Sequence, residues 1–185
     1  MESFDPIGLL EAVERHRVTH VQLVPTHMIR LLKLPSADRE RFDLSSLRMV
    51  VHAAAPCPVE VKRDFMAWVG PIVHEYYSGS EGVGFCRIGP EEWLAHPGSV
   101  GRSVSGTIRV LGPDGEEVPA GAEGEIWFEG ARRFEYHKDP AKTADAFDER
   151  GWSWLGDVGH VDEEGYLYLT DRAGHMIISG GVNIY

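Results

Sequence analysis

One turn near the middle of the chain gathers aromatic, hydroxyl and carboxylate side chains within a few residues. Residues 76–82 read YYSGSEG and follow an apolar segment. A flat ring can stack on a nucleobase, a hydroxyl can donate a hydrogen bond, and a carboxylate is the hard oxygen ligand that magnesium prefers. The turn therefore suits a nucleotide with its magnesium ion, while two sheet tyrosines followed by a polar turn are the structural alternative.

A second group of polar residues lies further along the chain. Residues 156–159 read GDVG, and Arg172 ends the next strand-like segment. A carboxylate held between glycines can accept hydrogen bonds from both hydroxyls of a ribose. The planar guanidinium of Arg172 can pair with phosphate or ribose oxygens. Asp157 could equally cap a turn, and Arg172 could pair with a surface acid.

The charge balance argues against nucleic acids as partners. The 185-residue chain has 18 Lys and Arg against 29 Asp and Glu, a net charge of -11, which repels phosphate backbones and anionic lipids. Cys57 and Cys86 lack CxxC spacing, so a reducing, cytoplasmic location is expected. No apolar run approaches the ~20 residues that cross a bilayer, so we expect no membrane-spanning segment.

The histidines do not predict a metal site. His16 and His20 are the one closely spaced pair among nine, and a strand is expected to begin between them. No third ligand follows at a spacing typical of zinc. The chain also lacks the GxxxxGK[ST] phosphate loop.

Strands that alternate with helices are predicted for the first part of the chain. Asp5 and Pro6 have the form of a helix start. Three apolar runs read as buried strands, over residues 20–24, 48–52 and 72–77. In the helix that precedes the third run, Val61, Phe65 and Trp68 recur at i, i+4 and i+7, which predicts one buried face.

This alternation favours a mostly parallel sheet with flanking helices up to about residue 88. Ligands of such sheets bind at the carboxyl ends of the strands. The turns over residues 53–58 and 78–82 would both lie at that edge.

Near residue 89 the sequence pattern changes to short apolar segments, which read as strands, separated by Gly, Pro and Asp. Strands over 107–111 and 124–128, a short helix over 140–147 and a hairpin over 161–169 favour antiparallel β structure. We therefore expect an α/β part over 1–88, a β-rich subdomain over 89–171, and a separate segment over 172–185.

In this order, the segments resemble the adenylate-forming superfamily of acyl-CoA synthetases, luciferases and peptide-synthetase adenylation domains. Residues 77–81 (YSGSE) are similar to its Tyr-Gly-x-Thr-Glu motif, and 53–56 (AAAP) resemble its adenine-binding turn. Residues 151–157 and 166–172 resemble its most specific signature, and 180–185 (GGVNIY) look like the start of its mobile C-terminal lid. The implied fold is the family's large N-terminal domain, a partial parallel sheet with helices followed by a small antiparallel subdomain, with 172–185 as hinge and lid start.

The resemblance implies an ATP-dependent acyl-CoA synthetase. Such an enzyme activates a carboxylic acid as acyl-AMP, with release of pyrophosphate, and transfers the acyl group to coenzyme A. ATP, Mg²⁺ and coenzyme A as co-substrate are the implied cofactors. The implied partners are small molecules, namely the carboxylic acid, ATP and coenzyme A, and not nucleic acid.

The family motifs also imply roles for individual residues. Tyr77 would stack on adenine, and Ala54, Ala55 and Pro56 would line the opposite side. Ser80 would donate a hydrogen bond to phosphate or to the acyl carbonyl, and Glu81 would bind magnesium. Asp157 would bind the two ribose hydroxyls, and Arg172 would bind the ribose oxygens.

Several positions depart from the family pattern. Ser78 and Ser80 replace the usual Gly and Thr, and Leu155 stands where Thr often precedes Gly-Asp. Gly174 occupies a hinge position that is commonly Asp or Lys, where glycine would swivel freely. The family's upstream phosphate-gripping loop and its lid domain with the adenylation lysine are absent from the sequence, so we expect an internal fragment with weak nucleotide binding and no catalysis alone.

Three functions fit the sequence. The apolar residues of 24–34 favour an acyl-CoA synthetase for fatty or related carboxylic acids. An amino-acid adenylation domain would need an acidic residue for the substrate ammonium, and none stands out over 21–28. A non-catalytic nucleotide-binding or interaction module would keep the fold without the chemistry. The sequence does not set the acyl chain length or the oligomeric state.

Overall fold

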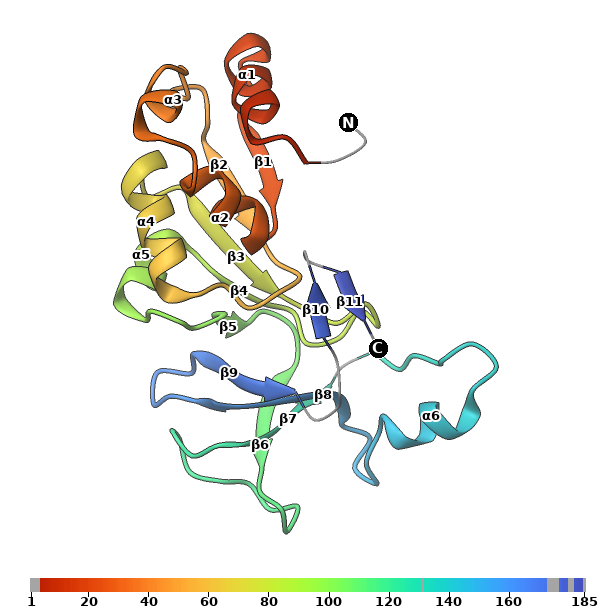
Figure 1. Cartoon of the computed structure of the whole chain (residues 1–185). Coiled ribbons are helices and arrows are strands. Elements are labelled where there is room, and N and C mark those ends of the chain that lie inside the picture. The colour runs from red at the N-terminus through yellow and green to blue at the C-terminus, as the bar shows by residue number, and fades with distance from the viewer. Residues whose placement is uncertain (1–3, 131, 173–176, 180–181, 185) are drawn as a thin grey trace. The chain divides into compact units, whose positions relative to one another are not determined.

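The computed structural model describes residues 4–130, 132–172, 177–179 and 182–184. The chain forms two compact units, and each is built from more than one stretch of the sequence (Figure 1). Of the described residues, the first unit comprises those within 4–75, 89–98 and 177–184, and the second comprises those within 76–88 and 99–172.

The first unit is built on three parallel strands with helices between them. Strand β1 (His20–Leu23) pairs with β2 (Met49–His52), which pairs with β3 (Val73–Tyr77). The helices of this unit are α1 (Pro6–His16), α2 (Pro25–Leu32), α3 (Ser36–Glu40), α4 (Val59–Val69) and α5 (Pro90–Ala95). The expected parallel α/β arrangement is therefore confirmed. Strand β3 carries the chain from this unit into the second.

Local sequence accounts for the start and end of α1. The Asp5 side chain accepts a hydrogen bond from the Ile7 amide at 3.1 Å, and Pro6 occupies the first helical turn, as predicted. The residue that caps the C-terminal end of the helix is Arg17, which adopts a left-handed conformation with φ of 50°.

The buried face of α4 differs from the predicted one. Lys62, Phe65 and Met66 are buried, whereas Val61 and Trp68 are only half-buried. Phe65 was correctly placed in the core. The face is rotated because Lys62 has an acidic partner inside the unit, which hydrophobic periodicity cannot anticipate.

The second unit is antiparallel. Strands β4 (Cys86–Ile88) and β5 (Arg102–Ser103) form one pair. A four-stranded sheet has the order β6 (Thr107–Leu111), β7 (Gly124–Glu129), β8 (Ser153–Val161) and β9 (Leu167–Arg172). The predicted strands and the hairpin around Asp162 are confirmed, and the predicted short helix is α6 (Pro140–Asp145). The core of the unit consists of Cys86, Val100, Ile126, Phe128 and Leu167.

Two tryptophans mark the pairing of β7 with β8. Trp127 and Trp154 are register partners on these strands. Their rings stack with centroids 5.9 Å apart and planes inclined by 16°. Aromatic pairs of this kind add to the stability of an antiparallel sheet.

The last described elements form a small antiparallel hairpin of β10 (Ile177–Ser179) and β11 (Val182–Ile184). The predicted hinge position, Gly174, lies outside the described residues. The predicted divisions near residues 89 and 172 stay predictions. Among the described residues, no helix combines the length and apolar character needed to cross a bilayer.

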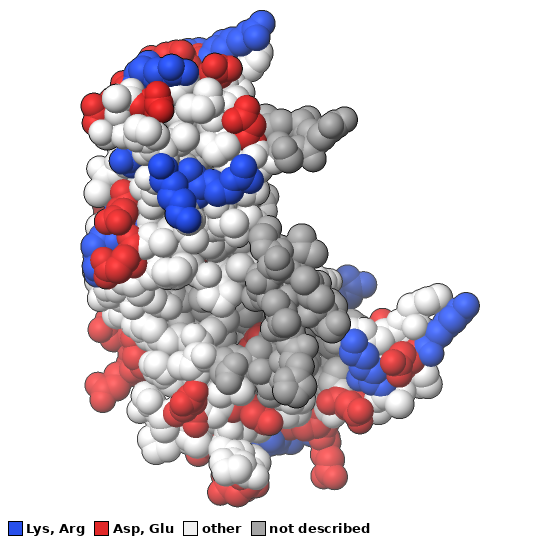
Figure 2. All heavy atoms as spheres, viewed as in Figure 1, with Lys and Arg blue, Asp and Glu red and all other residues white. Residues whose placement is uncertain are grey.

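Acidic and basic side chains are interspersed over the face shown in Figure 2. On the second unit, acidic side chains predominate over the face that this view shows. The acidic excess of the sequence is therefore displayed at the surface.

Candidate functional site

The turn after β3 is closed by its own hydrogen bonds. The Ser78 hydroxyl donates to the Gly79 and Val83 carbonyls at 3.2 Å each. The Gly79 amide donates to the Val83 carbonyl at 3.2 Å, and the Gly82 amide donates to the Gly79 carbonyl at 3.1 Å. Gly82 and Gly84 have φ of 75° and 69°, a left-handed conformation that glycine adopts without steric cost. The serine that departs from the family pattern at position 78 thus stabilises the turn.

Two glycines of this turn lie too close to other side chains to carry a Cβ atom. A Cβ on Gly79 would lie 2.7 Å from a Leu155 methyl group. A Cβ on Gly84 would lie 2.6 Å from the ring of Phe128, which is fully buried. The Phe128 ring centroid is in turn 6.2 Å from that of Tyr77. The turn is therefore fitted closely against β7 and β8.

Tyr77 and Asp157 meet although 80 residues separate them. The Tyr77 hydroxyl donates to Asp157 Oδ2 at 2.5 Å. Asp157 is 7% exposed and lies on β8, where its register partner in the backbone pairing is Arg172 of β9. A Cβ on Gly159 would lie 2.0 Å from the Tyr168 carbonyl oxygen, so the glycine permits the strand pairing beside Asp157. The structure thus joins the two polar groups that the sequence singled out separately.

Glu81 has a partner that sequence reasoning missed. The Tyr136 hydroxyl donates to Glu81 Oε1 at 2.8 Å. The backbone amide of Tyr136 donates to Thr143 Oγ1 at 2.9 Å, and the Lys142 ammonium lies 4.2 Å from the centre of the Tyr136 ring. The start of α6 therefore holds a tyrosine against the predicted magnesium ligand. An aromatic residue just before a helix start was the only signal in the sequence.

The other predicted site residues lie in the two turns. Ser80 is exposed in the turn after β3, next to half-buried Glu81. Ala54 is exposed in the first unit and has a left-handed φ of 74°. Ala55 and Pro56 follow it in the same turn after β2. Their expected position opposite Tyr77 stays a prediction, as does every predicted ligand contact.

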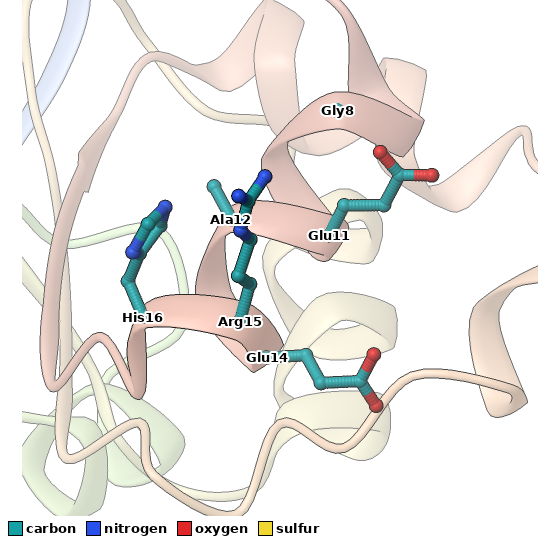
Figure 3. Close-up of a pocket in the computed structure, with 6 residues that line it drawn as sticks. All are labelled: Gly8, Glu11, Ala12, Glu14, Arg15 and His16. Carbon is teal, nitrogen blue, oxygen red and sulfur yellow. The ribbon is translucent and has the colours of Figure 1, made fainter.

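The candidate site is distinct from the hollow drawn in Figure 3. That hollow lies along one side of α1 and is lined by Gly8, Glu11, Ala12, Glu14, Arg15 and His16. None of these is a predicted site residue. Over the described part of the chain, no cluster of three or more His, Cys, Asp or Glu side chains could hold a metal ion.

Comparison with known families identifies the chain. The family model described as "AMP-binding enzyme" matches residues 1–135. The chain belongs to this family. The predicted resemblance to adenylate-forming enzymes is thereby confirmed.

Curated relatives match the chain over nearly its whole length. Indoleacetate–CoA ligase of Aromatoleum aromaticum is 33% identical over 98% of the chain and 36% of the relative. Feruloyl-CoA synthase of an Amycolatopsis species is 37% identical over 99% of the chain and 37% of the relative. The chain therefore spans little more than a third of the length of these relatives.

Solved structures share the fold. The amide bond synthetase McbA from Marinactinospora thermotolerans is similar with a TM-score of 0.88 and 34% identity, covering 100% of this chain and 38% of that one. ATP-bound MatB from Rhodopseudomonas palustris has a TM-score of 0.80 and 30% identity, covering 100% and 36%. The predicted fold class is confirmed by these neighbours.

Proposed function

We propose that the chain forms the nucleotide-binding part of a ligase that activates a carboxylic acid as acyl-AMP and transfers the acyl group to coenzyme A. The contact between Tyr77 and Asp157 is the observation that carries this proposal. It puts the implied adenine-stacking ring next to the implied ribose acceptor. The CoA-ligase names of several relatives support the reaction class.

The side chains of the second unit suit the first half-reaction. The Tyr77 ring offers a flat surface to adenine, and the Asp157 carboxylate can accept hydrogen bonds from ribose hydroxyls. The exposed Ser80 hydroxyl can donate to a phosphate oxygen. Together they would hold the α-phosphorus where a substrate carboxylate attacks it and pyrophosphate leaves, so that positioning lowers the barrier.

Glu81 has the chemistry of a magnesium ligand. Its carboxylate is half-buried, and the Tyr136 hydroxyl fixes Oε1. Hard carboxylate oxygens are suitable donors for Mg²⁺. When bound, the ion would neutralise charge on the departing pyrophosphate, while Tyr136 orients the carboxylate of Glu81.

The acid is proposed to carry an aromatic or an aliphatic group. Relatives act on indoleacetate, feruloyl, succinylbenzoate and long-chain fatty acyl substrates, as their names state. Met28 and Leu31, within the stretch that suggested a fatty acid, are fully buried in the core of the first unit. Their apolar character is explained by packing, so the choice between fatty and aromatic acids rests on experiment.

A second candidate is transfer of the acyl group to an amine. The similarity to the amide bond synthetase McbA, with 34% identity, favours it. Both candidates share acyl-AMP formation and differ in the nucleophile that displaces AMP. Mass spectrometry of the products formed with coenzyme A or with a primary amine as acceptor separates them.

Calorimetric titration of the chain with ATP and Mg²⁺ tests the shared step. We expect weak saturable binding that Asp157→Asn weakens at least tenfold, equivalent to about 1.4 kcal/mol. Glu163→Gln, which neutralises an exposed carboxylate of the β8–β9 hairpin, is the matched control and should bind normally. A folded chain that does not bind ATP, or an Asp157→Asn variant with unchanged affinity, would contradict the proposal.

A further inference from the structure

A buried group of ionisable side chains lies inside the first unit, apart from the residues with assigned roles. Lys62 is 0% exposed, and its Nζ atom donates to Glu75 Oε2 at 2.7 Å. Glu75 is 8% exposed. The ring of His52, also 0% exposed, has its Nε2 atom 3.2 Å from the same carboxylate oxygen. Lys62 Nζ further lies 4.7 Å from the centre of the buried Trp93 ring.

These side chains flank the turn over residues 53–58. His52 is the last residue of β2 and directly precedes the turn, while Lys62 lies in the first turn of α4 directly after it. Both contact one carboxylate of the neighbouring strand β3. The two ends of the turn are therefore attached to a single side chain, Glu75.

Hydrophobic packing supports this turn chiefly at its first residue, Ala53, which is 5% exposed. Residues 54, 56 and 58 are exposed, and residues 55 and 57 are half-buried. Ala54 also adopts a left-handed conformation with φ of 74°, which is unfavourable for a residue with a Cβ atom and persists only where the surroundings impose it. The constraint must therefore come mainly from the ends of the turn.

Stability alone does not explain a buried ion pair. The cost of removing two charges from water often equals or exceeds their attraction, and apolar residues of the same size stabilise a core as well. A short charged hydrogen bond does, however, fix the relative positions of its two elements. The pair is consequently better suited to setting geometry than to adding stability.

We propose that Lys62, Glu75 and His52 are positioning residues that hold the turn over 53–58 in place, with Ala54 in its left-handed conformation. The family resemblance implies that Ala54, Ala55 and Pro56 of this turn line the adenine. In that case, which rests on the proposed function, the three positioning residues prepare the turn for the nucleotide. Neutralising either charge should loosen the turn and weaken ATP binding while the sheet remains folded.

Cys57 reports directly on the turn. Burial, with a smaller contribution from the charge of Glu75, raises the pKa of its thiol to about 12, whereas the charge of Lys62 lowers that pKa. If electrostatics alone mattered, Glu75→Gln would speed alkylation of Cys57 and Lys62→Met would slow it. If the turn loosens, burial is lost in both variants and both should react faster. The two explanations thus predict opposite signs for Lys62→Met.

The experiment measures alkylation of Cys57 by iodoacetamide in the nucleotide-free chain, with peptide mass spectrometry as the readout. We expect at least a tenfold faster rate in both single variants. Cys86, which is fully buried in the second unit, is the internal control. Glu60→Gln, which breaks the exposed ion pair of Glu60 with Arg63 on α4, should leave the rate unchanged.

The double variant Lys62→Met with Glu75→Gln excludes simple unfolding, because it leaves no unpaired buried charge. We expect it to keep the urea midpoint of the parent chain and to alkylate Cys57 at least tenfold faster. Parent-like alkylation in this folded variant, or slower alkylation in Lys62→Met, would overturn the proposal.

Titration with ATP and Mg²⁺ then separates the turn from the proposed function. We expect the double variant to bind ATP at least fivefold more weakly than the parent chain. Faster alkylation with unchanged ATP affinity would show that the residues hold the turn but that the turn does not contact nucleotide, which would refute the ligand part alone.

Discussion

Substitution of Gly84 by alanine tests the close fit between the turn after β3 and the core of the second unit. Gly84 is left-handed with φ of 69°, and an added Cβ would lie 2.6, 2.7 and 2.9 Å from three atoms of the Phe128 ring. Real Cβ atoms essentially never approach so closely. Phe128 has 0% exposure and belongs to the core with Ile126 and Leu167, so its ring has little room to retreat.

The expected loss of stability has two parts. The left-handed conformation costs an alanine about 1–2 kcal/mol, and overpacking of a filled core costs about 1–3 kcal/mol more. Gly84→Ala should therefore lower the free energy of unfolding by about 2–5 kcal/mol. Gly82→Ala is a matched control, because Gly82 has φ of 75° but no atom within 4 Å of the position that an added Cβ would take. It should lose only the conformational part, about 1–2 kcal/mol.

Urea unfolding of both variants, followed by circular dichroism, provides the assay. The difference between the variants, about 1–3 kcal/mol, isolates the contact with Phe128 from the backbone effect. Equal destabilisation by the two substitutions would refute the inferred contact. A larger loss of unfolding free energy in Gly82→Ala than in Gly84→Ala would refute the backbone conformations assigned to Gly82 and Gly84.

Three further predictions concern the candidate site and the Cys86 thiol. Tyr77→Phe removes one donor to the buried Asp157 carboxylate and should lower the free energy of unfolding by about 1–3 kcal/mol in urea titrations; an unchanged midpoint would argue against the bond. Tyr136→Phe releases Glu81 Oε1 and should raise severalfold the Mg²⁺ concentration that half-saturates ATP binding, whereas an unchanged Mg²⁺ dependence would leave Tyr136 without this role. Burial raises the pKa of Cys86 to about 12, so its reaction with a disulfide reagent at pH 8 should be on the order of 10³ slower in the folded chain than in urea, and the folded rate should rise about tenfold per pH unit. Similar rates in the folded and unfolded chain would contradict its burial.

Local patterns predicted most of the secondary structure because each relevant signal lies within a few residues. The cap formed by Asp5 and Pro6, the apolar run that became β2, and the hairpin around Asp162 all depend on neighbours in sequence. Alternation of strands with helices was enough for a parallel sheet. The short strand β4 and helix α5 were missed because Cys86–Ile88 and Pro90–Ala95 are too brief to show periodicity.

Polar contacts between residues far apart in the sequence could not be predicted. Tyr77 and Asp157 were both selected for their chemistry, but no spacing rule connects residues 80 positions apart. Tyr136 was missed because a tyrosine in a loop carries no sign of its distant partner Glu81. The burial of Lys62 was missed because a buried lysine is recognisable only once its carboxylate partner is known.

The stacked tryptophans of β7 and β8 give the second unit an optical signal of its own. Two indoles as close as Trp127 and Trp154, with centroids 5.9 Å apart, couple their excited states and produce a paired circular-dichroism band that disappears when the strands separate. Trp93, 1% exposed beside the Lys62 ammonium, is one of the tryptophans of the first unit. On one urea titration, a fluorescence midpoint that differs from the midpoint of the dichroism band would show that the two units do not unfold together.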